Sequence, residues 1–143
     1  LTPDALELEI TENIILDGQD RVLAQLQDLR GMGIELSFDD FGTGYASLNL
    51  LKTYPVTHIK IDKSFTQAVQ TSPGDRAIVG SILDLAHQLG LKVVAEGVES
   101  QQSSDFLRRH GCEKGQGYYF GRPVPADLFA EQFWPKQIAI RLI

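Results

Sequence analysis

Four ionisable residues of this 143-residue chain stand at or just beyond the ends of short β-type segments. They are Glu9, Asp39, Lys60 and Glu96, which are three carboxylates and one amine. In parallel α/β proteins the carboxyl ends of the strands carry the active site. Ionisable groups that gather there are costly unless they pair with one another or with a metal ion. Carboxylate oxygens are hard ligands, so we expect a site for Mg²⁺ or Mn²⁺.

The elements that must position these residues alternate between strand and helix. Apolar residues recur at helical spacing over residues 21–32, 76–89 and 100–110. Asp75 and Ser100 are the expected N-caps of the last two helices, and a glycine follows each of them. The strands are expected at residues 6–10, 34–38, 58–62 and 91–95, with a weaker one at 117–120. Such alternation favours a parallel sheet, either doubly wound or closed as a barrel.

The expected strands are apolar on one face only. Ile59 and Ile61, for example, alternate with His58, Lys60 and Asp62. A sheet covered by helices on both faces has nearly continuous apolar strands instead. In a barrel the apolar face packs on the outer helices and the polar face points into the lumen. The pattern therefore favours an α/β fold of the TIM-like (β/α) barrel type, with a sheet covered on one face as the alternative.

The composition narrows the class of partner. A net charge of −6 argues against non-specific binding of DNA or RNA, which requires a basic surface. An acidic protein can still bind phosphate esters when divalent cations bridge the two. No apolar stretch approaches the roughly 18 residues that span a bilayer, and the chain begins with Leu1 rather than Met. We expect a piece of a longer cytoplasmic protein with no direct membrane contact of its own, whose parent is either soluble or membrane-tethered.

Five short motifs occur along the chain: Glu-Ile-Thr-Glu at 9–12, Asp-Asp-Phe-Gly-Thr-Gly-Tyr at 39–45, Ile-Lys-Ile-Asp at 59–62, Val-Ala-Glu-Gly-Val-Glu at 94–99, and Gly-Gln-Gly-Tyr-Tyr-Phe at 115–120 with Pro123 following. In type and order they resemble the motifs of EAL domains, the cyclic di-GMP phosphodiesterases of bacterial signal transduction. Each is modest evidence alone, and the ordered set is specific. The resemblance implies that residues 1–134 are the C-terminal part of an EAL domain and residues 135–143 a tail. About five of the eight strands of a barrel would then be present.

The resemblance implies two ions of Mg²⁺ or Mn²⁺ in the intact domain. Glu9 and Asp39 would ligate one ion. Asp39 would bridge to the second, which Asp40 would also face, with Glu96 beside it as a ligand or proton acceptor. Two metals that share a water make hydroxide available at neutral pH. The implied reaction is hydrolysis of cyclic di-GMP to linear pGpG.

The other motif residues are implied to contact the substrate or to hold the active-site loop. Lys60 would stabilise negative charge in the transition state, and Gln116 would hydrogen-bond to the water or the substrate. Glu12 would brace the glycine-rich loop through its backbone. The remaining loop and substrate residues are Phe41, Gly42, Thr43, Gly44, Tyr45, Asp62, Glu99 and Pro123.

Several of these site residues also have a plainer interpretation. Paired aspartates before Gly-x-Gly suit an ordinary turn, and a lone strand lysine usually extends its amine into water. Gln116 could simply satisfy backbone groups at the rim of a barrel. The shared strand-end placement of the acidic residues favours the functional interpretation, independently of the family resemblance.

Three parts of the family pattern are not among these residues: the Glu-Ala-Leu strand, an arginine that contacts phosphate and an asparagine that ligates metal. We therefore expect the isolated chain to bind metal weakly and to hydrolyse cyclic di-GMP negligibly. The strand at 6–10 would present an unpaired edge, which favours a homodimer or strand exchange with another chain. The parent would carry sensory or diguanylate-cyclase-like domains. Two alternatives stay open: a degenerate EAL domain that acts as a cyclic di-GMP receptor or protein-interaction scaffold, and a fragment that serves only as an assembly surface.

Overall fold

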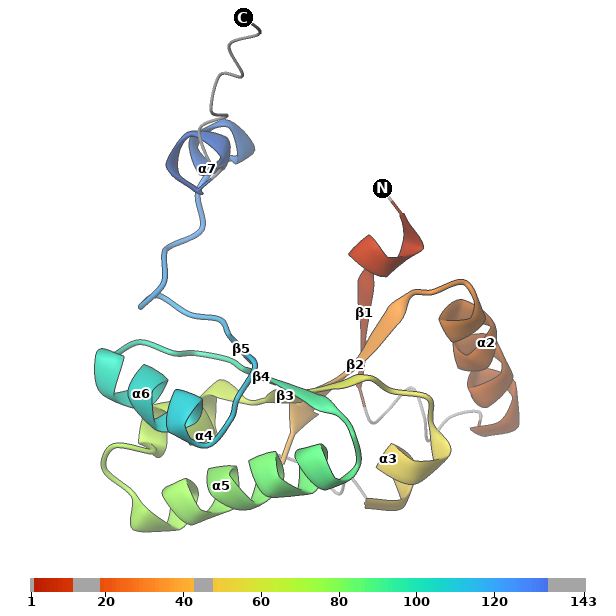
Figure 1. Ribbon diagram of the computed structural model, residues 1–143, viewed down its shortest axis with the longest axis horizontal. Coiled ribbons are helices and arrows are strands. Elements are labelled where there is room, and N and C mark those ends of the chain that lie inside the picture. The colour runs from red at the N-terminus through yellow and green to blue at the C-terminus, as the bar shows by residue number, and fades with distance from the viewer. Residues whose placement is uncertain (1, 12–18, 43–47, 134–143) are drawn as a thin grey trace, which may run out of the picture.

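One parallel five-stranded sheet, in the order β1-β2-β3-β4-β5, organises the computed structural model (Figure 1). The structure describes residues 2–11, 19–42 and 48–133. In a doubly wound sheet the strand order reverses at a switch point, whereas here it follows the sequence throughout, as in the wall of a barrel. The strands are β1 (Glu7–Ile10), β2 (Glu35–Phe41), β3 (His58–Ile61), β4 (Lys92–Ala95) and β5 (Lys114–Gly115).

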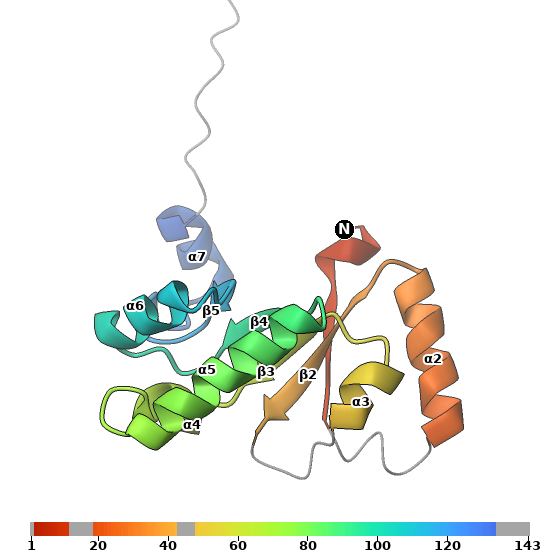
Figure 2. The ribbon, with the colours of Figure 1, turned by 60° about the horizontal axis from the view of Figure 1, so that its bottom comes forward.

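Helices connect successive strands, as right-handed crossovers between parallel neighbours require. In Figures 1 and 2, α2, α3 and α5 lie along the same side of the sheet. The elements outside the sheet are η1 (Pro3–Ala5), α2 (Gln19–Gly31), α3 (Leu48–Thr53), α4 (Lys63–Ala68), α5 (Pro73–Gln88), α6 (Gln101–Arg109) and α7 (Ala126–Phe133). None of the helices within the described ranges combines the length and apolarity that crossing a bilayer requires.

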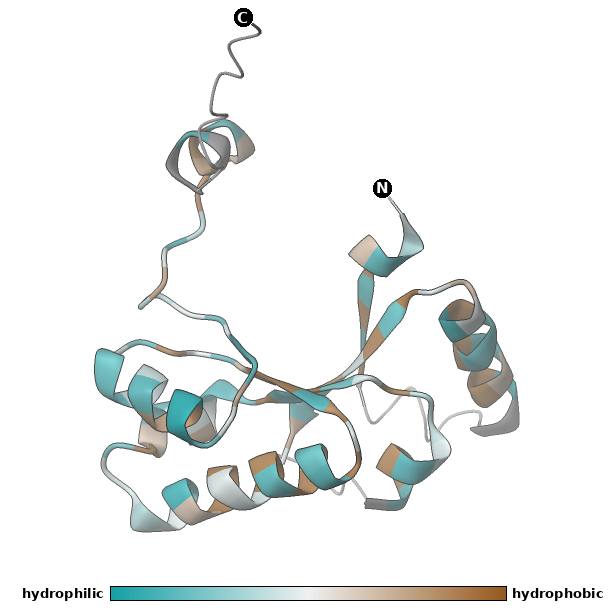
Figure 3. Cartoon of the chain, in the orientation of Figure 1, coloured by the Kyte–Doolittle hydropathy of each residue, from teal (hydrophilic) through white to brown (hydrophobic). Residues whose placement is uncertain are grey.

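The apolar strand residues form the core with the inner face of α5. Their alternation along each strand sends them to one side of the sheet, where the apolar stripe of α5 covers them, as the brown and teal pattern of Figure 3 illustrates. Removing this surface from water is the main stabilising contribution, at roughly 25 cal/mol per Å². The most deeply buried members are Leu36, Phe38, Ile59, Ile61, Val79, Leu83, Ala86, Val93 and Ala95.

The predicted N-cap of the long helix α5 was wrong by three residues. Ser72 caps it, and its Oγ accepts a hydrogen bond from the backbone N–H of Asp75 at 3.2 Å. Pro73 is the first helical residue, a position where its missing N–H costs nothing. Asp75 instead lies in the first turn, where its carboxylate favours the positive end of the helix dipole. The predicted cap of α6 is confirmed, because Ser100 Oγ accepts from the N–H of Ser103 at 3.1 Å.

The weak strand predicted at residues 117–120 was also wrong. Strand β5 lies three residues earlier, and residues 117–120 form a turn in which the N–H of Phe120 donates to Gly117 O at 3.1 Å. Val98 takes the hydrogen bonds of this segment: its N–H donates to Gln116 O, and its C=O accepts from Tyr119, both at 3.0 Å. A Cβ at position 117 would lie 2.2 Å from Val98 O, so the close approach requires glycine.

Candidate active site

Lys60 is the centre of a charged cluster at the carboxyl ends of the strands. Its Nζ lies 2.7 Å from Glu9 Oε1, 2.9 Å from Asp39 Oδ1 and 2.6 Å from Glu96 Oε1. Only 7% of the Lys60 side chain is exposed. Burial disfavours the ammonium charge, but the three carboxylates outweigh burial and raise the pKa of Lys60 above its usual range. The structure thus brings together the four residues that the sequence places at strand ends, with the amine of Lys60 at their centre.

The parallel sheet explains this convergence. Glu9, Asp39 and Lys60 lie on β1, β2 and β3, and Glu96 directly follows β4. Parallel neighbours end at the same edge of a sheet, so residues from four separate segments meet there. The N–H of Glu96 donates to Ile61 O at 3.1 Å, which extends the pairing of β3 and β4 as far as the cluster.

A local irregularity in β2 orients its two aspartates. The register between β2 and β3 shifts between Phe38 and Phe41, and Asp40 adopts a left-handed backbone with φ of 52°. Adjacent residues of a regular strand point to opposite faces, whereas a bulge turns a side chain out of that alternation. As a result, Asp39, Asp40 and Glu96 each offer a carboxylate oxygen, and these oxygens lie within 4.8 Å of one another.

This group of three carboxylates fits a divalent cation. Asp39 Oδ1 is buried and, apart from its ion pair with Lys60, has no hydrogen-bond partner. Three carboxylates this close repel one another, and a hard cation among them would offset that repulsion. Oxygen-only donors suit Mg²⁺ or Mn²⁺ rather than softer metals. Glu9, the other predicted ligand, lies against Lys60 and is not a member of this close group.

Gln116 follows the short strand β5 at the same end of the sheet. Its backbone N–H donates to Ala95 O at 2.8 Å, and its C=O accepts from the N–H of Val98 at 3.0 Å. The backbone is therefore held between β4 and the segment after it, while the side chain is exposed and free of described partners. This arrangement leaves the amide available to a ligand.

A pocket of about 510 Å³ adjoins Gln116, and Pro123 also lines it. Among its other lining residues are Tyr118, Arg122 and Phe129. The Arg122 guanidinium carbon lies 4.4 Å from the centroid of the Tyr118 ring. Aromatic faces and a guanidinium suit a planar, anionic ligand. Tyr118 belongs to the predicted motif at 115–120 but had no predicted role, and Arg122 and Phe129 were not predicted, although an aromatic run followed closely by arginine was the available signal.

Three other predicted residues make contacts elsewhere. Phe41 is buried, and its ring packs edge-on against that of Phe38 at a centroid distance of 6.0 Å. Asp62 caps α4 by accepting from the N–H of Ser64 at 2.9 Å. Glu99 accepts from Gln67 Nε2, also at 2.9 Å. Their described contacts are therefore with the core and with α4 rather than with Lys60.

The predicted active-site loop lies only partly within the described residues. Gly42 adopts φ of +100°, and a Cβ there would lie 3.0 Å from the Phe65 ring, so a larger residue would be strained. The other predicted loop residues, Glu12, Thr43, Gly44 and Tyr45, lie outside the described residues.

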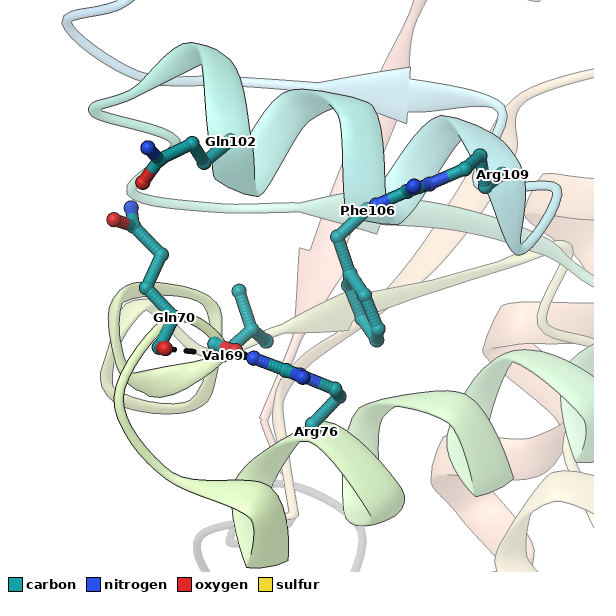
Figure 4. Close-up of a pocket in the computed structure, with 6 residues that line it drawn as sticks. All are labelled: Val69, Gln70, Arg76, Gln102, Phe106 and Arg109. Atoms are coloured by element: carbon teal, nitrogen blue, oxygen red, sulfur yellow. Dashed lines mark hydrogen bonds between the residues drawn. The ribbon is translucent and has the colours of Figure 1, made fainter.

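A second pocket, of about 240 Å³, lies where α4, α5 and α6 meet (Figure 4). Arg76 Nε and Nη2 donate to Val69 O at 3.0 and 2.9 Å, and the guanidinium carbon lies 5.9 Å from the Phe106 ring centroid. Gln70, Gln102 and Arg109 complete the lining. None of these residues belongs to the Lys60 cluster, and Arg76 serves here to join the helices.

Known proteins resemble this chain in sequence and in fold. The EAL domain family model matches residues 1–123. The cyclic di-GMP phosphodiesterase NbdA of Pseudomonas aeruginosa is 47% identical over 126 residues, which are 88% of this chain and 16% of NbdA. The chain spans less than a fifth of the length of the curated relatives that it matches first.

Solved structures agree on the fold. The PaMucR phosphodiesterase in complex with c-di-GMP is 44% identical with a TM-score of 0.83, over 90% of this chain and 52% of that one. BlrP1 of Klebsiella pneumoniae, in a manganese and cyclic di-GMP complex, is 36% identical with a TM-score of 0.78, over 86% of this chain and 31% of that one. The predicted fold is therefore confirmed as an incomplete TIM-like α/β barrel. With its barrel wall and ordered motifs, the chain belongs to the EAL domain family.

Proposed function

We propose that the intact domain hydrolyses cyclic di-GMP to linear pGpG with the help of divalent metal ions. The observation that carries this proposal is the meeting of Glu9, Asp39 and Glu96 around Lys60 at the strand ends. Two lines support it: NbdA is named a cyclic di-GMP phosphodiesterase, and the PaMucR phosphodiesterase structure holds c-di-GMP. The Mn²⁺ in the BlrP1 complex supports the metal dependence.

Asp39, Asp40 and Glu96 are the proposed metal ligands of this chain, and Glu9 is proposed to ligate a second ion together with residues from the rest of the domain. When bound, Mg²⁺ or Mn²⁺ lowers the pKa of a coordinated water and so provides a nucleophile at neutral pH. Asp39 is the residue proposed to bridge two ions, since it belongs to the close carboxylate group and also pairs with Lys60 beside Glu9.

The chain's own polar groups would act on the phosphodiester. Lys60 keeps its charge at neutral pH because its pKa is raised, so it can stabilise negative charge that develops on a phosphoryl oxygen. Glu96 can accept a proton from the attacking water if it is not occupied as a ligand. Gln116 can donate its amide N–H to the water or to the substrate, since its backbone is fixed and its side chain is exposed.

The charged cluster also bears on the alternative of a receptor or scaffold without activity. Such a role has no need of a buried lysine held by three carboxylates, so the retained cluster favours catalysis. We propose that the isolated chain nonetheless has negligible turnover, because the Glu-Ala-Leu, arginine and asparagine motifs are not in it.

The parent protein is proposed to place this module beside signalling domains. The relative MucR is named a bifunctional diguanylate cyclase and cyclic di-GMP phosphodiesterase, which supports a parent with further sensory or cyclase-like domains. We propose a cytoplasmic location for the domain. We also propose that residues 1–134 are the C-terminal part of the EAL domain and that residues 135–143 are a tail.

A chimera tests the proposal. The upstream part of the PaMucR phosphodiesterase, joined ahead of this chain, should complete the barrel and hydrolyse cyclic di-GMP with Mn²⁺, as followed by chromatography of pGpG. Asp40→Asn should lower Mn²⁺ affinity by about tenfold, or roughly 1.4 kcal/mol, and should lower turnover. Asp84→Asn, on the exposed face of α5, is the matched control. A folded chimera that binds cyclic di-GMP but never hydrolyses it would favour the receptor.

A further inference from the structure

A second tier of polar contacts lies on the same face of the sheet as the Lys60 cluster. Lys114 Nζ is 3.2 Å from Glu7 Oε2 and 3.3 Å from His58 Nε2. These residues come from β5, β1 and β3, so the contacts cross the sheet from one edge strand to the other (Figure 1). Each residue precedes a residue of the candidate site by two positions, and residues two apart in a strand share a face.

The ion pair between Glu7 and Lys114 requires a curved sheet. Adjacent strands are about 4.8 Å apart, so β1 and β5 would lie roughly 19 Å apart across four gaps in a flat sheet. Fully extended, the two side chains and the contact between them reach about 14 Å, for bonds near 1.5 Å. The ion pair therefore spans the concave face of the sheet, and it can form only when the sheet curves enough to bring β1 and β5 close together.

We propose that Lys114 is a positioning residue, which holds β1 and β5 at the spacing that the candidate site requires. Glu9 follows Glu7 on β1, and Gln116 follows Lys114 after β5, so fixing the lower tier fixes the separation of these two groups. The link to metal binding rests on the proposed function. The role of the Glu7–Lys114 pair in spacing β1 and β5 does not.

His58, on the central strand β3, provides a buried contact for the amine of Lys114. It is 1% exposed, and its Nδ1 lies 2.9 Å from Thr57 Oγ1. Thr57 Oγ1 in turn hydrogen-bonds to both the N–H and the C=O of Leu36 on β2. An ammonium can only donate, so His58 Nε2 is the acceptor and the ring is neutral. Burial lowers the pKa of His58 and favours this neutral form.

The pair is not primarily a stabilising device. The side chains of Lys114 and Glu7 are 51% and 31% exposed, and exposed ion pairs contribute little to stability. The distance between the two edge strands, rather than stability, is therefore the quantity to test.

The edge separation can be measured between spin labels at Asp4→Cys and Gly121→Cys in a Cys112→Ser background, by double electron–electron resonance. Lys114→Met should shift the distances to longer values and broaden their distribution. The charge-reversed double variant Glu7→Lys/Lys114→Glu should restore the narrow distribution. Lys52→Met, on the surface of α3, should leave it unchanged. Unchanged distances in Lys114→Met would show that Lys114 does not set the spacing of β1 and β5.

Mn²⁺ titration of the same variants tests the link to the site. Positioning predicts that Lys114→Met weakens Mn²⁺ binding, by about two- to fivefold, and that the reversed pair restores it. A purely electrostatic role predicts the opposite sign, because removing a positive charge near carboxylates strengthens cation binding. Tighter or unchanged binding would therefore overturn the positioning role. If the wild-type chain binds no Mn²⁺, the metal site proposed at Asp39, Asp40 and Glu96 fails instead. The label distances still show whether Lys114 sets the spacing of β1 and β5.

Discussion

Lys60 shows how one buried cation can organise the charges around it. Its amine contacts carboxylates from three other segments of the chain, all within 3 Å. A buried ion pair contributes little net stability relative to apolar packing, but removing one partner leaves the others uncompensated. Loss of Lys60 should therefore destabilise the cluster, and the same carboxylates can also bind an incoming metal cation.

Replacing Lys60 with methionine should lower the free energy of unfolding by about 2 kcal/mol at pH 7. Methionine matches the apolar stem of lysine as far as Cε but leaves the three carboxylates without a counter-charge. Urea unfolding followed by circular dichroism measures the change. Lys52→Met, at an exposed site, should change stability by no more than about 0.5 kcal/mol. Equal stabilities of the wild type and Lys60→Met would show that the ion pairs contribute nothing.

The same comparison has a pH dependence with a defined sign. The folded pKa of Lys60 is raised, so its stabilising contribution is fully present below the unfolded lysine pKa of about 10.4. It is lost as the pH rises through the folded pKa. The difference in unfolding free energy between wild type and Lys60→Met should therefore hold from pH 7 to pH 9 and shrink in more alkaline buffer. A difference that grows with pH would contradict this assignment.

At the scale of elements, helix starts and strand ends decide where the site residues lie. Helix α5 covers the sheet behind Lys60, and its start is set by Ser72 and Pro73 together. The bulge in β2 is the corresponding feature of the sheet, because it turns Asp40 towards the same side as Asp39.

The corrected cap of α5 gives a matched pair of variants. Ser72→Ala removes the hydroxyl that accepts from Asp75 N–H and should lower the unfolding free energy by about 1 kcal/mol. Asp75→Ala removes only a favourable charge near the helix dipole, which is worth about 0.3–1 kcal/mol and is screened by salt. Thermal unfolding at low and high salt distinguishes the two, since only the Asp75→Ala effect should diminish in salt. The reverse ranking in high salt would restore Asp75 as the cap.

At the scale of the whole molecule, the sheet is a wall with two edges. Within the described residues, β1 pairs only with β2, and β5 only with β4. Leu6 and Leu8 are 46% and 40% exposed beside the β1 edge. Unpaired edges flanked by apolar residues recruit other strands.

The isolated chain should therefore associate with a second copy. Sedimentation velocity should show a species heavier than the monomer, and its share should rise with concentration. Leu8→Lys, which places a charge at the edge, should shift the chain towards monomer. A well-behaved monomer at every concentration, with cooperative melting, would count against association.

Local pattern determined much of this protein from sequence alone. The period-two alternation of the strands and the helical spacing between them predicted four of the five strands and the three main helices, because both periods come from backbone geometry. The same parity predicted that Glu9, Asp39, Lys60 and Glu96 share a face, and their positions at strand ends predicted that they meet at one end of the sheet. Strand ends and helix caps were harder to predict. Ser72 and Asp75 are both good capping residues three positions apart, and Pro73, which suits the first helical position, favours Ser72.

Long-range contacts decided the rest. The position of β5 depends on Val98, which takes the hydrogen bonds of residues 116–119. The bulge at Asp40 exists only because β2 pairs with β3 in a shifted register. Lys114 reaches Glu7, at a sequence separation of 107, only because the sheet curves. Sequence period sets which face a side chain occupies, whereas register and curvature arise from the pairing of distant strands, which no local pattern encodes.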